Sequence, residues 1–395
     1  MLPGARCAGA AVLKTQVAII GAGPAGLLLG HSLRQADIEC VIIERTSQAR
    51  VEERIRAGIL ETTLTDLMAR LGLDARLKAE GLLHHGLILV NDGQSIPVEI
   101  FGSTGRYVTA YGQTEVTRDL IDAAAGAGLD IVWEAAEVAL HDVGSDEPFV
   151  TWASGRIDCE VIVGCDGFHG PSRASIPNAK TFERAYPFGW LGVLADVPPC
   201  HEHVVYASHE RGFALASMRS PTRSRYYVQV GLDERVEDWS DERFWDELCL
   251  RLGPEIAANV TRGPSIEKSI APLRSFVSEP MRHGRLFLAG DAAHIVPPTG
   301  AKGLNLAASD VIYLSEALIG WFQRGETAGI DGYSDRALRR VWKTERFSWY
   351  LTKLMHRFPD DGPFERRMQI AELDYIASSA AAQASIAENY VGLPL

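Results

Sequence analysis

The sequence predicts a mixed α/β fold: a Rossmann-like dinucleotide-binding domain, an inserted domain built on an antiparallel sheet, and a helical C-terminal region. Residues 17–44 place a glycine-rich turn and a helical pattern between two short apolar runs, as in a βαβ unit. Residues 181–277 contain long runs in which apolar and polar residues alternate, which indicates antiparallel strands. After residue 304 the patterns are almost entirely helical.

These patterns divide the chain into four segments. We expect the dinucleotide-binding domain at 14–181, the inserted sheet at 182–278, a return to the first domain at 279–310, and the helical region at 311–395. The helical region is expected to form a dimer interface, although helices of this kind pack within one chain just as often. Short strands are expected between residues 86 and 111, inside the first segment.

The first unit begins with Val17–Ile20, an apolar run long enough for a buried parallel strand. Residues 25–34 show helical periodicity without a breaker, and Val41–Ile43 is a second buried strand. Two further amphipathic helices are predicted, at 59–80 and at 114–125.

The turn of this unit has the spacing G-x-G-x-x-G. Gly21 would allow the tight turn, Gly23 would let backbone approach a pyrophosphate, and Gly26 would permit close packing of helix on strand. Glu44 ends the second strand, where a carboxylate can bind a ribose hydroxyl. The pattern predicts a dinucleotide site. The alternative is a glycine-rich turn in another α/β protein, and the motif does not separate FAD from NAD.

Composition and charge exclude several classes of protein. The chain has 395 residues, of which 46% are hydrophobic and 23% charged, and its formal net charge is −12. Duplex nucleic acid is not an expected partner, because its binding depends on neutralising phosphates. No apolar run reaches the roughly 18 residues that a membrane-spanning helix needs. Residues 1–16 are interpreted as a disordered extension or as the result of an early start codon, because their apolar stretch is too short for a secretory signal.

The six cysteines indicate a reduced, cytoplasmic protein. None of them forms a C-x-x-C pair, so neither a zinc site nor a redox disulfide is indicated, and no metal is expected. Cysteines in cytoplasmic proteins are usually free thiols.

Charged residues gather at two further places. Arg54 and Arg56 follow the first unit and should lie near the phosphates of a bound dinucleotide, although a solvated helix face explains them equally well. In the inserted domain, three arginines cluster around Ser217 and two tyrosines; they are Arg219, Arg223 and Arg225, and the tyrosines are Tyr226 and Tyr227.

A second glycine box follows an apolar strand at residues 161–163. It contains Asp166 and two cationic side chains, His169 and Arg173, which suit an anionic cofactor. A strand-end turn with surface charges is the alternative.

A third box follows the apolar run at 286–288. Asp291 comes directly after this strand, and Pro297 and Pro298 stiffen the loop that follows. A helix begins at Leu304, so its free N–H groups should point at that loop.

The three boxes, in this order, resemble those of the single-component flavoprotein aromatic hydroxylases of the group A class. The boxes are GAGPAG at 21–26, CDGFHGPSR at 165–173 and GDAAHIVPPTGAKGLN at 290–305. Further motifs extend the resemblance to the members of this class that act on 4-hydroxybenzoate, and it covers nearly everything from residue 14 onward. They include RIRAG at 54–58, YGQTEVTRDL at 111–120, RSRYYVQV at 223–230 and ENYVGLP at 388–394.

The resemblance implies a tightly but non-covalently bound FAD. The adenosine half of the FAD would lie on the first box and Glu44, and its pyrophosphate along Arg54 and Arg56. The N-terminus of the helix near Leu304 would face the flavin, where partial positive charge stabilises the anionic reduced ring. The positions that match the family's FAD contacts are Gly21, Gly23, Gly26, Glu44, Arg54, Arg56, Gln113, Arg225, Asp291, Leu304 and Asn305.

The resemblance also implies a substrate site. Ser217, Arg219 and Tyr227 match a clamp for a carboxylate, which a guanidinium grips with two parallel hydrogen bonds. Tyr206 and Tyr390 match the tyrosines that bind the substrate phenol and pass on its proton. The remaining matches are Pro298, whose carbonyl would face the phenol, and His84, at the outer end of the proton path, with His85 as a competing assignment.

The implied activity is hydroxylation of 4-hydroxybenzoate at the 3-position, through a flavin C4a-hydroperoxide, with O2 and NAD(P)H as co-substrates. A hydroxylase of a related para-substituted aromatic acid is the alternative. A flavin reductase, a halogenase or a non-catalytic FAD protein are competing classes.

The nucleotide donor is left open between NADPH and NADH. Relatives that prefer NADPH carry Arg-Gln and, five residues past that arginine, a tyrosine. This chain keeps the arginine as Arg45, but Thr46 and Arg50 replace the other two residues. The positions that match the family's nucleotide contacts are Arg45, Arg56, His169 and Arg274.

Overall fold

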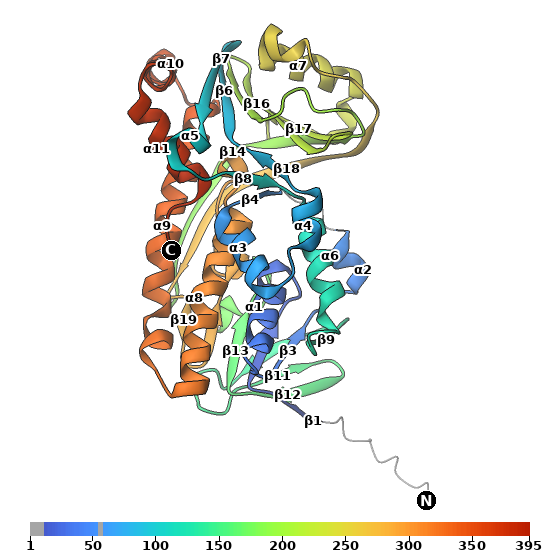
Figure 1. Ribbon diagram of the computed structural model, residues 1–395, viewed down its shortest axis with the longest axis vertical. Helices are drawn as coiled ribbons and strands as arrows, with labels where there is room; N and C mark the ends of the chain where they lie inside the picture. The colour runs from blue at the N-terminus through green and yellow to red at the C-terminus, as the bar shows by residue number, and fades with distance from the viewer. Residues whose placement is uncertain (1–11, 54–57) are drawn as a thin grey trace, which may run out of the picture.

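The computed structural model describes residues 12–53 and 58–395 (Figure 1). A mostly parallel sheet and its helices occupy the lower half of Figure 1, and an eight-stranded sheet occupies the upper half. Two long helices, α8 (Gly303–Arg324) and α9 (Ala328–Met355), run along the side of the molecule. This is the mixed α/β architecture that the sequence predicts.

The lower sheet is built around the predicted βαβ unit. β2 (Val17–Ile20) pairs in parallel with β3 (Cys40–Ile43) on one side and with β13 (Val161–Gly164) on the other. All four residues of β2 are apolar and buried, as expected for a strand that is covered on both faces. The strand order is β19 (Arg282–His283), β20 (Leu286–Leu288), β13 (Val161–Gly164), β2 (Val17–Ile20), β3 (Cys40–Ile43) and β9 (Asp130–Val132).

Two smaller sheets accompany it. One lies in the order β1 (Val12–Lys14), β12 (Gly155–Asp158), β11 (Phe149–Trp152) and β10 (Ala139–His141). The other lies in the order β4 (Ile59–Leu60), β8 (Val108–Ala110) and β5 (Leu82–His84).

The predicted helices of the first domain are found with one correction. The single helix expected at 59–80 is wrong: the stretch begins with β4 and then forms two helices, α3 and α4. Gly72 ends α3 in the left-handed conformation (φ 73°), which glycine adopts without steric cost. The helices before the inserted segment are α1 (Pro24–Gln35), α2 (Gln48–Glu52), α3 (Thr62–Leu71), α4 (Ala75–Glu80), α5 (Ile100–Thr104) and α6 (Gln113–Ala124).

The upper sheet is mainly antiparallel, as the alternation predicts. Its edge also takes up β6 and β7 from residues 86–99, and β6 pairs in parallel with β15. The sheet therefore draws on a stretch outside 182–278. The strand order is β21 (His294–Ile295), β18 (Ser265–Glu279), β14 (Lys180–Ala195), β17 (Arg223–Val230), β16 (Gly212–Ser220), β15 (Val204–His209), β6 (Gly86–Asn91) and β7 (Gln94–Glu99).

The two faces of this sheet bury separate cores. One face packs against α7 (Asp241–Ala257), with Val228 and Trp245 among the buried residues. The other face packs against α9 and the last two helices, α10 (Pro363–Ser378) and α11 (Ala380–Val391). Tyr206 lies on this second face.

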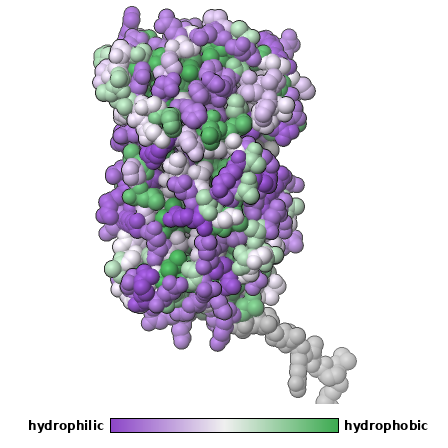
Figure 2. All heavy atoms as spheres, in the orientation of Figure 1, coloured by the Kyte–Doolittle hydropathy of each residue, from purple (hydrophilic) through white to green (hydrophobic). Residues whose placement is uncertain are grey.

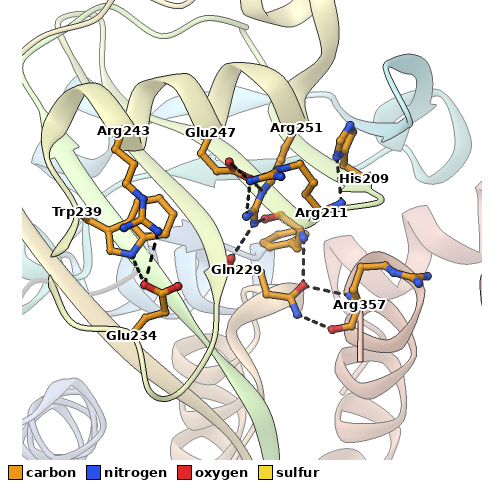
Figure 3. A network of polar contacts seen from close by, with 10 residues as sticks. His209, Arg211, Gln229, Glu234, Trp239, Arg243, Glu247, Arg251 and Arg357 are labelled. Atoms are coloured by element: carbon orange, nitrogen blue, oxygen red, sulfur yellow. Dashed lines mark hydrogen bonds and ion pairs between the residues drawn. The ribbon is translucent and has the colours of Figure 1, made fainter. Parts of the chain in front are cut away.

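A polar network fastens α7 to the sheet (Figure 3). The buried guanidinium of Arg251 donates from Nη1 to the carbonyl oxygens of Phe213 (3.0 Å) and Gln229 (2.8 Å). Glu247 on the same helix accepts from Arg251 (2.8 Å) and from Arg211 of the β15–β16 turn (2.9 Å). Since α7 closes one face in this way, the opposite face is left for the functional site.

On the face of the molecule drawn in Figure 2, hydrophilic residues predominate and the hydrophobic areas are small. None of the helices in residues 12–53 and 58–395 is both long enough and apolar enough to cross a bilayer.

One buried carboxyl group should make stability depend on pH. Glu345 on α9 is 5% exposed; its Oε2 accepts from Ser275 Oγ of β18 (3.0 Å), and its Oε1 has no partner among the described residues. Burial raises the pKa of Glu345 from 4.5 to about 7, although Ser275 and His294 oppose the shift.

The sign of the effect follows from linkage. As pH rises from about 4.5 to about 7, the unfolded state loses this proton before the folded state does, so the free energy of unfolding falls. Glu345→Gln should remove about 1–3 kcal/mol of this pH dependence. Urea unfolding of the FAD-loaded protein at about pH 5 and about pH 8 measures it. Asp335→Asn changes an exposed carboxylate on the same helix and is the control. If the free energy of unfolding changed equally between the two pH values in wild type and in Glu345→Gln, the prediction would be contradicted.

Candidate active site

The three glycine boxes meet at one edge of the parallel sheet. Ile20, Gly164 and Leu288 are paired across β2, β13 and β20, so each box begins where its strand ends. Parallel strands present their carboxyl ends at the same edge, which is where α/β folds bind dinucleotides. A Cβ on Gly290 of the third box would lie 3.4 Å from Cβ of Ala25 in α1.

The glycines of the first box meet different demands. Gly21 has a φ of 105°, and a Cβ there would lie 2.5 Å from the Cys165 carbonyl oxygen of the second box. A Cβ on Gly26 would lie 2.0 Å from the carbonyl oxygen of Gly21. At Gly23, by contrast, no described atom beyond its chain neighbours lies within 4 Å of the Cβ position. Packing therefore requires Gly21 and Gly26, whereas Gly23 faces open space at the start of α1, as a cradle for a pyrophosphate should.

Glu44 is held against this loop. Its side chain is 4% exposed, and Oε2 accepts from the backbone N–H of Ala22 (2.9 Å). Its Oε1 accepts from the backbone N–H and the hydroxyl of Thr46 (3.0 and 2.7 Å). The carboxylate is thus oriented at the end of β3, beside the glycine turn.

The start of α8 is the second part of the cradle. Leu304 and Asn305 lie in its first turn, where backbone N–H groups have no partner within the helix. The Asn305 amide is already engaged: Oδ1 accepts from Glu61 N (2.8 Å), and Nδ2 donates to Ile59 O (2.9 Å). No described atom lies within 4 Å of a Cβ built on Gly303, so the helix start faces open space.

The other predicted FAD contacts are dispersed around this edge. Asp291 is exposed in a short 3-10 turn at Gly290–Ala292, and Gln113 is the first residue of α6. Arg54 and Arg56 lie outside the described residues.

The residues expected to bind substrate share one face of the eight-stranded sheet. Tyr206 is paired with Leu215, Leu215 with Tyr227, and Ser217 with Arg225, across β15, β16 and β17. Side chains of paired residues lie on the same face, so this register carries Tyr206, Ser217 and Tyr227 to one side. Arg219 lies at an irregularity of β16, between Met218 and Ser220, and its guanidinium interacts with the Tyr227 phenol on that face.

Gly192 lies against this face and is not among the residues that the sequence predicts for it. It lies opposite Tyr227 on β14, and a Cβ there would be 2.7 Å from the Tyr227 ring and 3.0 Å from Arg225 Nη2. A glycine inside a long strand signals close approach of another group, and this signal was present in the sequence. Trp190 on the same strand was also missed; its ring centroid lies 5.0 Å from that of Tyr227.

Arg225 and Arg219 at this face differ in whether they form an ion pair with a carboxylate of the protein. Arg225 is 5% exposed and forms a two-bond ion pair with Glu267 (2.7 and 3.2 Å). No carboxylate of the described residues forms an ion pair with the half-buried Arg219. Burial lowers the pKa of Arg219, and the neighbouring Tyr227 phenol opposes that shift. Arg219 is therefore suited to receive a carboxylate.

The two predicted proton-carrying tyrosines are in contact. Their hydroxyl oxygens lie 3.0 Å apart, and the residues are 1% and 2% exposed. Burial raises the pKa of Tyr206 well above its usual value and that of Tyr390 to about 12. Both phenols are therefore protonated at neutral pH, and each can donate one hydrogen bond while accepting another.

The structure places the remaining predicted residues as follows. Pro298 begins a 3-10 turn at Pro298–Gly300, and its carbonyl oxygen accepts from Ala301 N (2.9 Å), which leaves one lone pair. His84 in β5 is completely buried, whereas His85 is exposed.

Two of the four predicted nucleotide contacts gather around Phe168. The His169 ring meets it edge-on with centroids 5.0 Å apart, and the Arg274 guanidinium lies 4.4 Å from its centroid. Arg45 is exposed after β3, and Arg56 lies outside the described residues.

The glycine cradle and the sheet face with its paired tyrosines define an FAD-dependent monooxygenase of the aromatic-hydroxylase class. The chain belongs to the family described as "FAD binding domain", whose model matches residues 14–348. It is 57% identical over 389 residues to p-hydroxybenzoate hydroxylase of Acinetobacter baylyi, covering 97% of this chain and 96% of the relative.

More distant relatives share the architecture. Rifampicin monooxygenase of Rhodococcus hoagii is 25% identical over 341 residues, covering 84% of this chain and 68% of the relative. The crystal structure of p-nitrophenol 4-monooxygenase from Pseudomonas putida DLL-E4 superposes with a TM-score of 0.81 at 18% identity. The match covers 97% of this chain and all of the other, and at that identity it shows the fold alone.

The cradle predicts different outcomes for two glycine variants. Gly23→Ala should fold normally but bind FAD about ten- to a hundredfold more weakly, because the added methyl enters the ligand's space and overpacking costs about 1–3 kcal/mol. Gly26→Ala should instead destabilise the fold, because its methyl overlaps backbone.

Fluorescence titration of the apoprotein with FAD, alongside thermal unfolding, separates the two effects. Gly332→Ala on α9 is the control, because its Cβ position is equally open. An unchanged dissociation constant for Gly23→Ala would argue against the cradle.

Proposed function

We propose that this chain hydroxylates 4-hydroxybenzoate at the 3-position to give 3,4-dihydroxybenzoate, using O2 and a reduced nicotinamide nucleotide. The observation that carries the proposal is the hydrogen-bonded pair Tyr206–Tyr390, because Tyr206 shares its sheet face with Tyr227, whose phenol interacts with Arg219. The name of the Acinetobacter baylyi relative supports the same substrate.

The proposed clamp holds the acid at its carboxylate. Arg219 offers a planar fork that matches a carboxylate, and Ser217 and Tyr227 add hydroxyl donors. Arg219 is four residues along β16 from Leu215, the partner of Tyr206, which is about 13 Å of strand. That distance accommodates an arginine side chain and a small aromatic acid in line.

The tyrosine pair handles the other end of the substrate. Tyr206 accepts the phenol proton while it donates its own to Tyr390, and Tyr390 in turn gives up its own proton toward His84, so both tyrosines end neutral. The substrate becomes phenolate-like, which makes the carbon beside the oxygen nucleophilic. FAD, when bound, supplies hydride acceptance and oxygen activation. The buried sheet face excludes water from the reacting atoms.

The cradle residues described above would hold FAD: Gly23 beneath the pyrophosphate, Glu44 at the ribose, and the first turn of α8 at the ring. We propose that NADPH or NADH contacts the protein around Phe168, through His169 and Arg274. Oxidation rates with the two donors at equal concentration, with substrate present, decide which is preferred.

We also propose a cytoplasmic homodimer. Cys40, Cys159, Cys165, Cys200 and Cys249 are free thiols, which supports a reducing compartment.

A second copy is the occupant that we propose for the exposed apolar stripe of α10. The stripe contains Phe364 (69% exposed), Met368 (49%) and Tyr375 (54%), whose spacing puts them on one helix face. A light-scattering mass equal to one 43.1 kDa chain would contradict the dimer.

Removal of one phenol tests the proton path. Tyr206→Phe should retain FAD and substrate but hydroxylate at least about a hundredfold more slowly, because a general acid–base group is lost. Reduced nucleotide should then be consumed with release of hydrogen peroxide. The product is measured by chromatography. Tyr186→Phe, another buried tyrosine with a hydrogen bond to Ser275 (3.2 Å), is the control. Wild-type hydroxylation by Tyr206→Phe would refute the assignment.

A change of cation shape tests the clamp. Arg219→Lys should raise the dissociation constant for 4-hydroxybenzoate at least about tenfold, because a point charge cannot copy the two-bond fork. Substrate titration of the flavin absorbance measures the change. Arg223 is exposed and forms an ion pair with Asp196, so Arg223→Lys is the control and should bind 4-hydroxybenzoate with wild-type affinity. Equal affinity in wild type and Arg219→Lys would count against the clamp.

A further inference from the structure

The proton path requires an exit that His84 alone cannot provide. The family resemblance implies that His84 lies at the outer end of the path, but its side chain is 0% exposed. Neither of its ring nitrogens has a hydrogen-bond partner in the described part of the chain. A buried imidazole that receives a proton must pass it to another group before the proton reaches solvent.

A second histidine lies beside it and extends to the surface. The ring centroids of His84 and His203 are 6.0 Å apart and tilted by 45°, a separation that one water molecule can bridge. The His203 side chain is 18% exposed, and its Nδ1 has no partner among the described residues. His203 directly precedes β15, three residues before Tyr206.

The backbone makes room for this ring. A Cβ on Gly86 would lie 3.2 Å from Cδ2 and 3.2 Å from Nε2 of His203. Val204 pairs in parallel with Leu87, which sets Gly86 opposite His203. Gly86 is two residues after His84 in the chain. A larger side chain at this position would crowd the imidazole that lies next to His84.

We propose that His203 is the next carrier in the proton path, accepting the proton from His84 and releasing it to solvent. This inference rests on the proposed function. At each imidazole the arriving proton bonds to one nitrogen while the other nitrogen gives up its own, so the ring ends neutral. One proton leaves for each phenol that is deprotonated, and no electrons are transferred.

The surroundings of His84 and His203 lower the pKa of both imidazoles, so neither ring holds a proton permanently near pH 7. Burial lowers the pKa of His84 to about 4, with smaller contributions from His203, His201 and His85. Burial also lowers the pKa of His203; Glu202 and Glu99 oppose that shift, and His201 and His85 add to it. Both rings are therefore neutral near pH 7 and can accept a proton without retaining it.

The neighbouring histidines have other positions. His85 is exposed and directed at Phe101 and Tyr107, with ring centroids 5.4 and 6.0 Å away. Successive side chains of an extended chain point in opposite directions, so His85 faces away from His84. His201 Nδ1 accepts from the backbone N–H of His203 (2.9 Å), which holds the turn that presents the carrier.

The test measures proton release. FAD-loaded enzyme is mixed with 4-hydroxybenzoate in weakly buffered solution containing a pH indicator, and the rate of proton release is followed by stopped flow near pH 7. His203→Leu should slow release at least about tenfold and leave the substrate dissociation constant unchanged. Added imidazole should restore the rate. His203→Gln, which keeps a polar side chain, should be slow as well and covers the case in which His203→Leu fails to fold.

His85→Leu is the matched control and should release the proton at the wild-type rate. Wild-type release in His203→Leu or His203→Gln, slow release only in His85→Leu, or slow release that imidazole does not restore would each overturn the inference. These outcomes leave the proposed function intact if wild type forms 3,4-dihydroxybenzoate. If wild type forms none of it, the proposed function itself fails.

Discussion

The 3.0 Å hydrogen bond between Tyr206 and Tyr390 joins the eight-stranded sheet to the last helix of the chain, and the geometry of the site depends on it. Tyr390 is held by a buried cation: Lys302 Nζ donates to its carbonyl oxygen and to Glu61 Oε1, both at 2.6 Å. Burial lowers the pKa of Lys302, and the carboxylate of Glu61 opposes that shift. The other carboxylate oxygen, Glu61 Oε2, lies 3.6 Å from Arg340 Nη2, so two cations surround the carboxylate beside Tyr390.

The chain end is held from other segments as well. Arg340 of α9 donates to the carbonyl oxygens of Leu393 (2.6 Å) and Pro394 (3.0 Å), and Arg106 donates to that of Gly392 (2.7 Å). Lys302 precedes α8 directly, so the start of this helix and the position of Tyr390 are coupled. The cofactor cradle and the phenol site are thus linked through one ion pair.

The loop between β20 and α8 belongs to both sheets. It begins at the edge where the three glycine boxes meet, and it then forms β21, in which Ile295 pairs with Phe276 of β18. The loop thus connects the edge where the glycine boxes meet directly to the antiparallel sheet.

Local patterns in the sequence were sufficient for the glycine boxes, the βαβ unit and the alternation of the inserted strands, because turns and periodicities involve neighbouring residues. They also indicated Tyr206, Arg219 and Tyr390 through family resemblance. Only the tertiary structure decided that His84 is buried and His85 exposed, that Gly192 makes room for Tyr227, and that β6 and β7 join the upper sheet. Each of these depends on strands far apart in the chain, whose register no local pattern encodes.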